Sequence, residues 1–196
     1  MKFTTDIFDS FPVKKEPVRG DPRDIKRRDF KPSEIIVLFA CESLPHETEN
    51  FFYYAHSPLY NNTLGAFKKV FPKITQANFF QYFKDLGFYL DDLCGQPINQ
   101  LKKGNDRKKR IELRKLYEPD FAKRVELYKP QFVIITPMEI KDNIISVLSI
   151  AKSKTPFRDL PFPMGNQANK DNYVNGLVDL LKELIEKKII SPVVFD

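Results

Sequence analysis

The sequence predicts an α/β protein, a three-layer α/β/α sandwich with a short, mainly parallel four-stranded sheet. Short apolar, β-branched runs bounded by polar segments indicate strands that are buried on both faces, as in a parallel sheet. Stretches with helical spacing of apolar residues alternate with these runs along the chain. We therefore expect right-handed crossovers and a ligand site at the carboxyl ends of the strands.

Residues 1–33 differ in composition from the rest of the chain. They mix charges and prolines with isolated phenylalanines, and no helical or alternating period runs through them. We expect an extended N-terminal arm that packs on the domain through its phenylalanines, followed by a single α/β/α domain over residues 34–196. The run Lys26-Arg27-Arg28 can meet phosphate, but a solvated charge run is the favoured interpretation.

The first half of the domain contains two predicted strands. Residues 35–40 form a continuous apolar run with β-branched residues, and residues 88–90 form a second short strand. Two short helices lie between them. Asn62 or Thr63 caps the first, and Gly87 supplies the left-handed stop of the second.

The second half adds two more strands and three helical segments. Residues 105–128 are charged and helical, and Pro119 predicts a break into two pieces because proline favours the first turn of a helix. Residues 131–136 form the third strand, and a helical repeat of apolar residues follows it. Residues 155–160 form a fourth, edge-like strand, since prolines at its ends are tolerated only there. The last helix, about residues 170–188, has one apolar stripe.

Composition excludes several classes of protein. The longest apolar run has seven residues, whereas a membrane span needs roughly 20, so no membrane partner is expected. The first residues contain no signal-peptide core, and two cysteines cannot build a disulfide framework or a four-cysteine metal site. The seven glycines form no nucleotide-binding loop motif. We expect a cytoplasmic protein without metal or cofactor, whose net charge of +6 permits a polyanionic partner without requiring one.

Two features follow the first predicted strand. Glu42 lies directly beyond it, where a carboxylate has partial desolvation and ligand access together. It serves there as a general base or charge stabiliser, or it caps nearby backbone amides. The run Phe51-Phe52-Tyr53-Tyr54 cannot all face one core, so one or two of its rings can stack on a ligand. Packing in the core and at its rim is the alternative.

Polar groups also follow the second strand and precede the last helix. Asp91 and Asp92 form a carboxylate pair that suits acid–base chemistry or metal binding; alternatively, one caps a turn and the other is solvated. Gly165, Asn166 and Gln167 precede the last helix, where free backbone amides and the helix dipole favour an anion.

The cysteine and histidine residues indicate a functional site less strongly than the basic residues do. Cys41 with His46 and His56 matches no closed zinc pattern, and we expect a buried, inert thiol and two exposed histidines. The densest basic stretch places Arg107, Arg110 and Arg114 on one helical face. That face can follow a phosphate backbone, and solvated helical charge is an equal alternative.

Five segments, in this order, resemble motifs of the uracil-DNA glycosylase superfamily. The resemblance covers about residues 34–188. The segments are ACESLP (40–45), FFY (51–53), FYLD (88–91), QFVIIT (131–136) and PFPMGNQ (161–167), the last one directly before a long amphipathic helix.

The resemblance implies a four-stranded parallel sheet between helices that holds a flipped base. Glu42 then stands where the water-activating, catalytic acid would be, and Asp91 where an asparagine would read the base. Phe51 or Phe52 would stack on the base, and Phe162 stands where many members have histidine. The candidate substrate-binding residues are Cys41, Ser43, Phe51, Phe52, Tyr53, Asp91, Phe162, Gly165, Asn166 and Gln167, and the candidate residues for the nucleic-acid backbone are Arg107, Arg110 and Arg114.

The implied function is that of a DNA glycosylase-like hydrolase, which cleaves the N-glycosidic bond of a flipped, damaged or modified base in DNA repair. The alternative is a non-catalytic nucleic-acid or nucleotide-binding protein with the same fold, favoured by the missing histidine. Nucleic acid, above all DNA, is the expected partner of a monomer, and two cysteines exclude members with an iron–sulfur cluster. An ionised Asp91 offers only acceptors, which suits a base with an exocyclic amine better than uracil; a protonated Asp91 would mimic asparagine.

Overall fold

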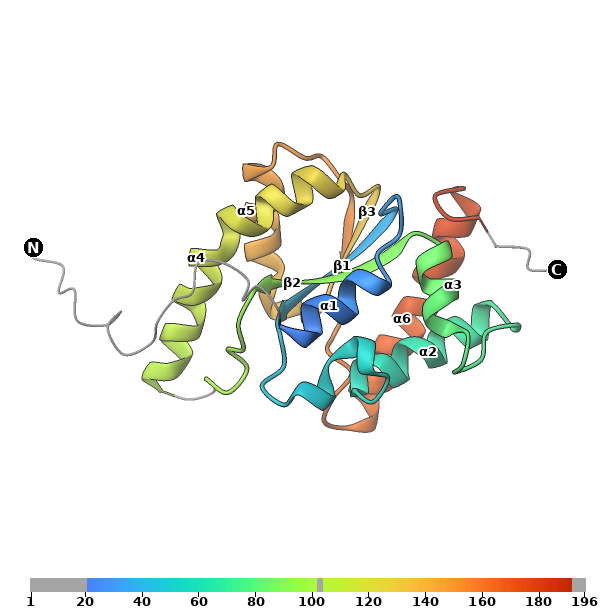
Figure 1. Ribbon diagram of the computed structural model, residues 1–196, viewed down its shortest axis with the longest axis horizontal. Helices are drawn as coiled ribbons and strands as arrows, with labels where there is room; N and C mark the ends of the chain where they lie inside the picture. Colours follow the sequence, from blue (N-terminus) through green and yellow to red (C-terminus); the bar gives the residue numbers. More distant parts are fainter. Residues whose placement is uncertain (1–20, 102–103, 192–196) are drawn as a thin grey trace, which may run out of the picture.

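The computed structural model describes residues 21–101 and 104–191 and has the predicted α/β/α architecture (Figure 1). The strands are β1 (Val37–Ser43), β2 (Phe88–Cys94), β3 (Phe132–Ile135) and β4 (Phe157–Asp159). All strand pairs are parallel, and the order across the sheet is β2-β1-β3-β4. The predicted fourth strand is therefore confirmed as a short edge strand.

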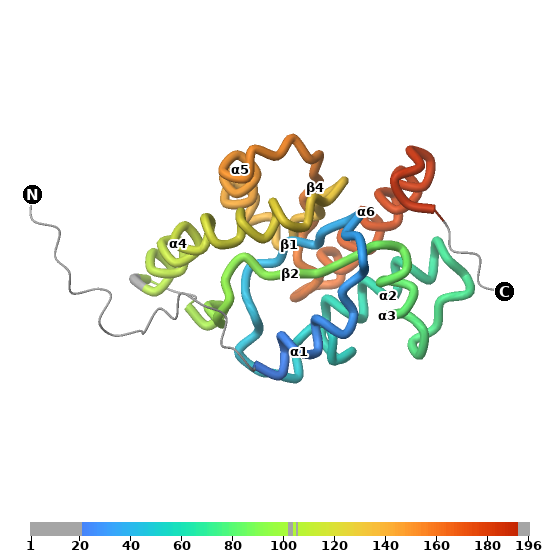
Figure 2. Tube along the Cα trace, turned by 45° about the horizontal axis from the view of Figure 1, so that its top comes forward, coloured from blue at the N-terminus to red at the C-terminus, as the bar shows by residue number. Residues whose placement is uncertain are grey.

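The helices of the described residues cover both faces of this sheet. They are α1 (Pro22–Asp29), α2 (Pro58–Val70), α3 (Phe79–Asp85), α4 (Asn105–Tyr128), α5 (Lys141–Ile150) and α6 (Gln167–Glu186), with the short 3₁₀ helices η2 (Thr48–Asn50), η3 (Phe52–Tyr54) and η4 (Met138–Ile140). Helices α4 and α5 lie on one face, whereas α2, α3 and α6 lie on the other (Figure 2). None of the described helices is long and apolar enough to cross a membrane.

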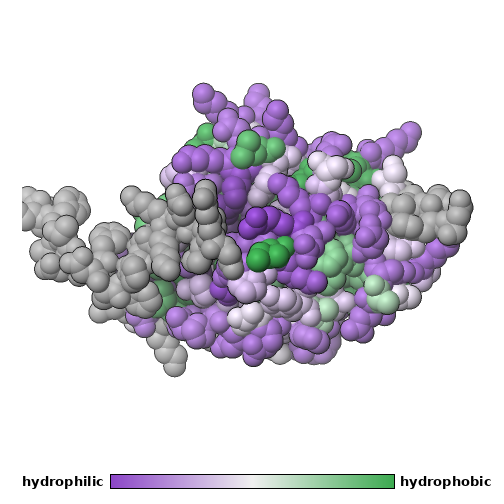
Figure 3. All heavy atoms as spheres, in the orientation of Figure 1, coloured by the Kyte–Doolittle hydropathy of each residue, from purple (hydrophilic) through white to green (hydrophobic). Residues whose placement is uncertain are grey.

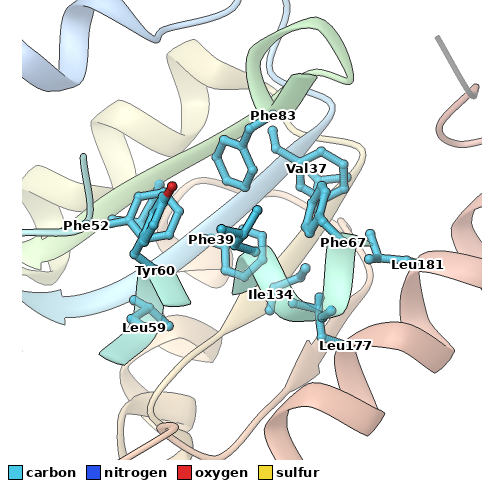
Figure 4. Packing of buried hydrophobic residues seen from close by; sticks show 14 of the residues in the cluster. Val37, Phe39, Phe52, Leu59, Tyr60, Phe67, Phe83, Ile134, Leu177 and Leu181 are labelled. Atoms are coloured by element: carbon cyan, nitrogen blue, oxygen red, sulfur yellow. The ribbon is translucent and has the colours of Figure 1, made fainter. Parts of the chain in front are cut away.

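Each face of the sheet has its own hydrophobic core, because alternate residues of a strand point to opposite faces. Phe39 of β1 lies in the core beneath α2, α3 and α6, whereas Leu38 and Ala40 lie in the core beneath α4 and α5. The first core is rich in aromatic rings, and Figure 4 shows Phe39, Phe52, Tyr60, Phe67 and Phe83 packed together. On the outside, hydrophilic residues dominate the face seen in Figure 3, and hydrophobic residues form small separate groups on it.

The segment before β1 is helical where the sequence predicted an extended arm. Helix α1 begins after Asp21, whose carboxylate accepts a hydrogen bond from the backbone N–H of Arg23 at 2.8 Å. Phe30, just after α1, anchors the segment on the core by stacking on Tyr53, with ring centroids 5.8 Å apart. Arg27 is buried instead of solvated, at 7% exposure. Residues 1–20 of the predicted arm lie outside the described residues.

Two helix boundaries also differ from the sequence prediction. Helix α2 is capped by Ser57, whose Oγ accepts the backbone N–H of Tyr60 at 3.1 Å, and not by Asn62 or Thr63. Helix α4 continues through Pro119, which is itself exposed. The buried side chains of α4 account for this continuity, because packing of a helix face against the sheet outweighs the loss of one backbone hydrogen bond. These side chains are Leu113, Tyr117, Phe121 and Val125.

The turn between α3 and β2 follows the prediction. Gly87 has φ of +75°, the left-handed conformation expected of the residue that ends the helix. Its backbone carbonyl accepts hydrogen bonds from the N–H groups of Ile36 and Val37 at 2.8 and 3.1 Å. The turn therefore fixes the start of β2 beside the start of β1.

Candidate functional site

A cavity of about 930 Å³ lies at the carboxyl ends of β1, β2 and β3. This is the position that the rule for parallel α/β sheets predicts for a ligand. The strands contribute its floor, and α4 and the loops after β1, β2, β3 and β4 contribute its walls. Its lining includes Cys41, Glu42, Ser43, Glu47, Phe51, Phe52, Asp92, Asn99, Arg107, Arg110, Arg114, Lys115, Glu139, Phe162 and Met164.

One wall of the cavity is aromatic. Phe51 and Phe52 are almost fully buried, and Phe162 is half-buried in the loop after β4. Phe52 is held by edge-to-face contacts with Tyr60 and other rings of the aromatic core. These rings belong to the core, as one of the two alternatives for this aromatic run expects, and they also line the cavity; stacking on a ligand stays a prediction.

Tyr53, in contrast, packs in the core and does not line the cavity. Its hydroxyl accepts the backbone N–H of Leu90 at 2.9 Å, and it is absent from the cavity lining. This bond ties η3 to β2, so Tyr53 supports the site from behind. Burial raises the pKa of its hydroxyl well above the usual value.

Glu42 is bound by two arginines of α4. Nε of Arg110 donates to Oε1 at 2.7 Å, and Nη2 of Arg110 donates to Oε2. Arg114 also donates to Oε1, and its Nη1 donates to the backbone carbonyl of Glu139 at 3.2 Å. Glu42 is 6% exposed, so its carboxylate is a buried counter-charge for both arginines and not a cap of backbone amides.

The basic face predicted on residues 105–128 is turned to this cavity. Arg107, Arg110 and Arg114 line it, as does Lys115. Arg107 and Lys115 are exposed, whereas Arg114 is buried. The hydrogen bond to Glu42 raises the pKa of Arg110. The cavity therefore has two solvated cations and two that are held by a carboxylate.

Asp91 and Asp92 point to opposite faces of the sheet. Asp91 faces α4, where it accepts hydrogen bonds from Nε of Arg124 at 2.8 Å, from the hydroxyl of Tyr128 at 3.0 Å, and from Arg27. It does not line the cavity. Burial acts to raise its pKa, but the charges of Arg124 and Arg27 outweigh burial and lower it. Asp91 is thus an ionised partner of structural arginines.

Asp92, on the other face, does line the cavity. Its Oδ2 accepts a hydrogen bond from Nη2 of Arg27 at 2.6 Å. Burial, with the charge of Asp91 in addition, raises the pKa of Asp92 to about 6 although Arg27 opposes the shift. A buried carboxyl in a cavity with such a pKa is typical of functional sites.

Helix α1 reaches the site through two arginines. The guanidinium of Arg27 lies over the ring of Phe51, 5.4 Å from its centroid, while it bonds Asp91 and Asp92. Nη1 of Arg23 donates to the backbone carbonyl of Pro45 at 2.7 Å. Sequence reasoning missed both contacts, because their partners are far away along the chain.

The loop before α6 contributes less than predicted. Gly165, Asn166 and Gln167 are exposed and lie outside the cavity lining, whereas Met164 and Phe162 belong to it. Asn166 caps α6 by accepting the backbone N–H of Asn169 at 2.9 Å. Its side-chain oxygen is therefore committed to the helix.

Cys41 and the histidines match the expectation from sequence. Cys41 is buried, and burial raises the pKa of its thiol well above the usual value, which makes it inert. His46 and His56 are exposed. Within residues 21–101 and 104–191, no group of three or more potential ligands is arranged to hold a metal ion.

Asn99 is one of several lining residues that sequence reasoning did not single out. It lies in the loop after β2, and its Oδ1 is buried with no hydrogen-bond partner among the described residues. A polar loop residue between Ile98 and Gln100 carries no sequence signal that distinguishes it from other turn residues.

Comparisons with known proteins found no relative of this chain. The chain matches no family model, and neither the curated proteins nor the solved structures include a match. The residues around this cavity are therefore the features of the chain that bear on its function.

Proposed function

We propose that the protein binds nucleic acid and takes one of its bases into the cavity. The observation that carries this proposal is a single cavity that joins an aromatic wall to a basic helix face. A base and its phosphates need those two surfaces side by side. The four-stranded parallel sheet also agrees with the fold that the resemblance to the uracil-DNA glycosylase superfamily implies.

The aromatic wall suits the flat face of a base. Stacking of a base on an aromatic side chain contributes about 1–3 kcal/mol and tolerates any sequence. Phe162 is half-buried and has ring surface to offer to a base, while Phe51 and Phe52 are almost fully buried and keep this wall rigid through core packing. A base that leaves its stack costs a few kcal/mol, and this wall recovers part of that cost.

The basic face suits the phosphates on either side of that base. Arg107 and Lys115 are exposed, so their long side chains can follow a backbone. Arg110 and Arg114 are oriented by Glu42, which keeps their guanidinium groups in the wall of the cavity. In this proposal Glu42 positions the arginines, since both of its oxygens already accept hydrogen bonds from them.

Hydrolysis of the N-glycosidic bond is the second candidate function, and Asp92 favours it. Cleavage passes through a cationic sugar that a nearby carboxylate stabilises while it orients water. Asp92 lines the cavity with a pKa of about 6, close to the pH at which a general base operates. The enzyme would then be a glycosylase-like hydrolase whose acid is Asp92 or, as the resemblance implies, Glu42.

Binding is tested by the salt dependence of affinity for single-stranded and duplex oligonucleotides. A double variant in which both Arg107 and Lys115 are replaced by Gln should reduce the slope of log affinity against log salt by about 1–2. The matched control replaces Lys68 and Lys69 of α2, which are exposed and outside the cavity lining, and should leave the slope unchanged. Salt-independent or absent binding by the wild type contradicts the proposal.

Hydrolysis is tested by base release from oligonucleotides that contain uracil, hypoxanthine or alkylated bases. Asp92→Asn should abolish release while the affinity for the oligonucleotide stays within a few-fold. If the wild type releases none of these bases but binds them, the protein is a binding module and the second candidate is wrong.

A further inference from the structure

The cavity contains an acceptor that no described residue satisfies. Oδ1 of Asn99 is buried and lacks a hydrogen-bond partner among the described residues, although Asn99 lines the cavity. Buried polar atoms are almost always hydrogen-bonded, so an unpartnered one needs an explanation. A ligand that donates an N–H to this oxygen is such an explanation, and it requires the Asn99 side chain to turn toward the cavity, because the oxygen is covered in this structure.

A second acceptor lies on β2, the strand that precedes the loop of Asn99. Oδ2 of Asp92 is occupied by Arg27, while Oδ1 takes no hydrogen bond from a described residue. Asp92 lines the same cavity as Asn99. An ionised carboxylate has only acceptors to offer.

The fold brings these two residues to the same end of the sheet. Asp92 is in register with Cys41 of β1, and Cys94 is in register with Ser43. Oγ of Ser43 accepts the backbone N–H of Ile98 at 3.5 Å, which returns the loop after β2 to the carboxyl end of β1. Asn99 is the next residue, and it lines the same cavity as Asp92.

We propose that Asp92 and Asn99 make the cavity selective for a base that presents two N–H donors on one edge, which among the common bases is guanine. This inference rests on the proposed function, because it names the base that the cavity takes. Guanine offers N1–H and the 2-amino group side by side, and both can meet acceptors. Uracil places its N3–H between two carbonyl oxygens, so at least one of them would face a protein acceptor.

The other bases fit the acceptor pair less well. Adenine and cytosine each carry one exocyclic amine beside a ring nitrogen that is itself an acceptor. Each of these bases donates from its amine to one of the two protein acceptors, and the lone pair of its ring nitrogen then faces the other. The order of affinity should therefore be guanine first, adenine and cytosine next, and uracil last.

The test uses short single strands in which one base is flanked by abasic sites, so that only that base can enter the cavity. A fully abasic strand of the same length measures phosphate binding alone. Guanine should bind about five- to a hundredfold more tightly than uracil, because one mispaired buried hydrogen bond changes affinity by that factor. Hypoxanthine, which lacks the 2-amino group, should fall between them.

Asn99→Leu removes the acceptor and keeps a side chain of similar size. The ratio of its affinities for guanine and uracil should be at least about fivefold lower than in the wild type, and its affinity for the fully abasic strand should not change. Gln100→Leu is the matched control, since Gln100 is the adjacent, exposed residue and lies outside the cavity lining. It should retain the full preference.

The outcomes separate this inference from the proposed function. Equal binding of all bases, tighter binding of uracil, or an unchanged preference in Asn99→Leu overturns the inference and leaves the proposed function standing. If strands with a base bind no better than the abasic strand, the proposed function itself fails and the inference falls with it.

Discussion

Arg27 and Asp92, 65 residues apart in the chain, form a buried ion pair with Nη2 2.6 Å from Oδ2. The same guanidinium also bonds Asp91 and lies over the ring of Phe51. One side chain of α1 thus contacts two carboxylates of β2 and the aromatic wall of the cavity. Helix α1 is therefore part of the framework of the site.

Arg27→Met should destabilise the protein by about 3–5 kcal/mol, because it leaves two buried carboxylates without their shared cation. Urea unfolding monitored by circular dichroism measures the change. Arg28→Met is the matched control, since Arg28 is the exposed neighbour, and should cost about 0.5 kcal/mol or less. Equal unfolding midpoints for the two variants would contradict the role given to Arg27.

Glu42→Gln should lower the free energy of unfolding by about 2–4 kcal/mol, because Arg114 is buried and loses its charged partner. Guanidinium unfolding is unsuitable for an ion-pair network, so the measurement is thermal or urea unfolding at constant ionic strength. Glu47→Gln serves as the control, because Glu47 also lines the cavity but is exposed. A Glu42→Gln variant as stable as the control would mean that the carboxylate does not hold the arginines.

The stability of the protein should respond to the titration of Asp92. Its folded-state pKa of about 6 lies above the ordinary value of 3.8, so its stabilising contribution is complete below about pH 4. That contribution is lost as pH rises through about 6. The groups around this carboxyl are Arg27 of α1, Asp91 of β2 and Arg124 of α4.

Asp92→Asn mimics the protonated carboxyl at every pH. Relative to the wild type, this variant should therefore gain on the order of 1–3 kcal/mol of stability between pH 4.5 and pH 7.5 (both chosen about 1.5 units either side of the pKa). Unfolding curves at the two pH values give this difference directly. Asp171→Asn, at an exposed position of α6, should show no such gain. A difference of the opposite sign would refute the raised pKa.

Gly87→Ala should cost about 2–4 kcal/mol, because the residue has φ of +75° and a Cβ would lie 2.6 Å from Cγ1 of Ile36. The Cβ of Ile36 is also too close, at 2.9 Å, so a change of rotamer alone does not relieve the contact. Gly95→Ala is the control, since the methyl group of an alanine there would meet nothing within 4 Å. Thermal unfolding of both variants measures the contrast, and similar losses would show that the turn tolerates a side chain.

Much of the fold follows from local pattern. Residues 35–40 are apolar without interruption and begin with three β-branched residues, a pattern typical of a strand that is covered on both faces. The last helix, α6, was identified by its apolar stripe, because a helix that packs one face on a core repeats apolar residues at helical spacing. Helix α1 could not be found in this way. It is fixed by a buried arginine, and an arginine in a sequence normally indicates a solvated position.

The candidate site was harder to predict than the fold, because its key contacts join residues that are distant in sequence. Glu42 was placed correctly at a strand end, but its partners Arg110 and Arg114 lie 68 and 72 residues away. The roles of Asp91 and Asp92 depended on where β2 ends. The strand extends to Cys94 instead of stopping at residue 90, so the two carboxylates alternate across the sheet and only Asp92 reaches the cavity.

The order of α1 and β2 along the chain has a consequence for synthesis on the ribosome. Arg27 emerges 64 residues before Asp91, so the cation is already available when the two carboxylates leave the exit tunnel. A circular permutation that moved α1 behind α6 would reverse this order. Arg124 of α4 would still reach Asp91 during translation, but Asp92 would lack its partner Arg27 until the last segment was translated. We therefore expect such a permutant to give a lower yield of soluble protein even if its finished fold were equally stable.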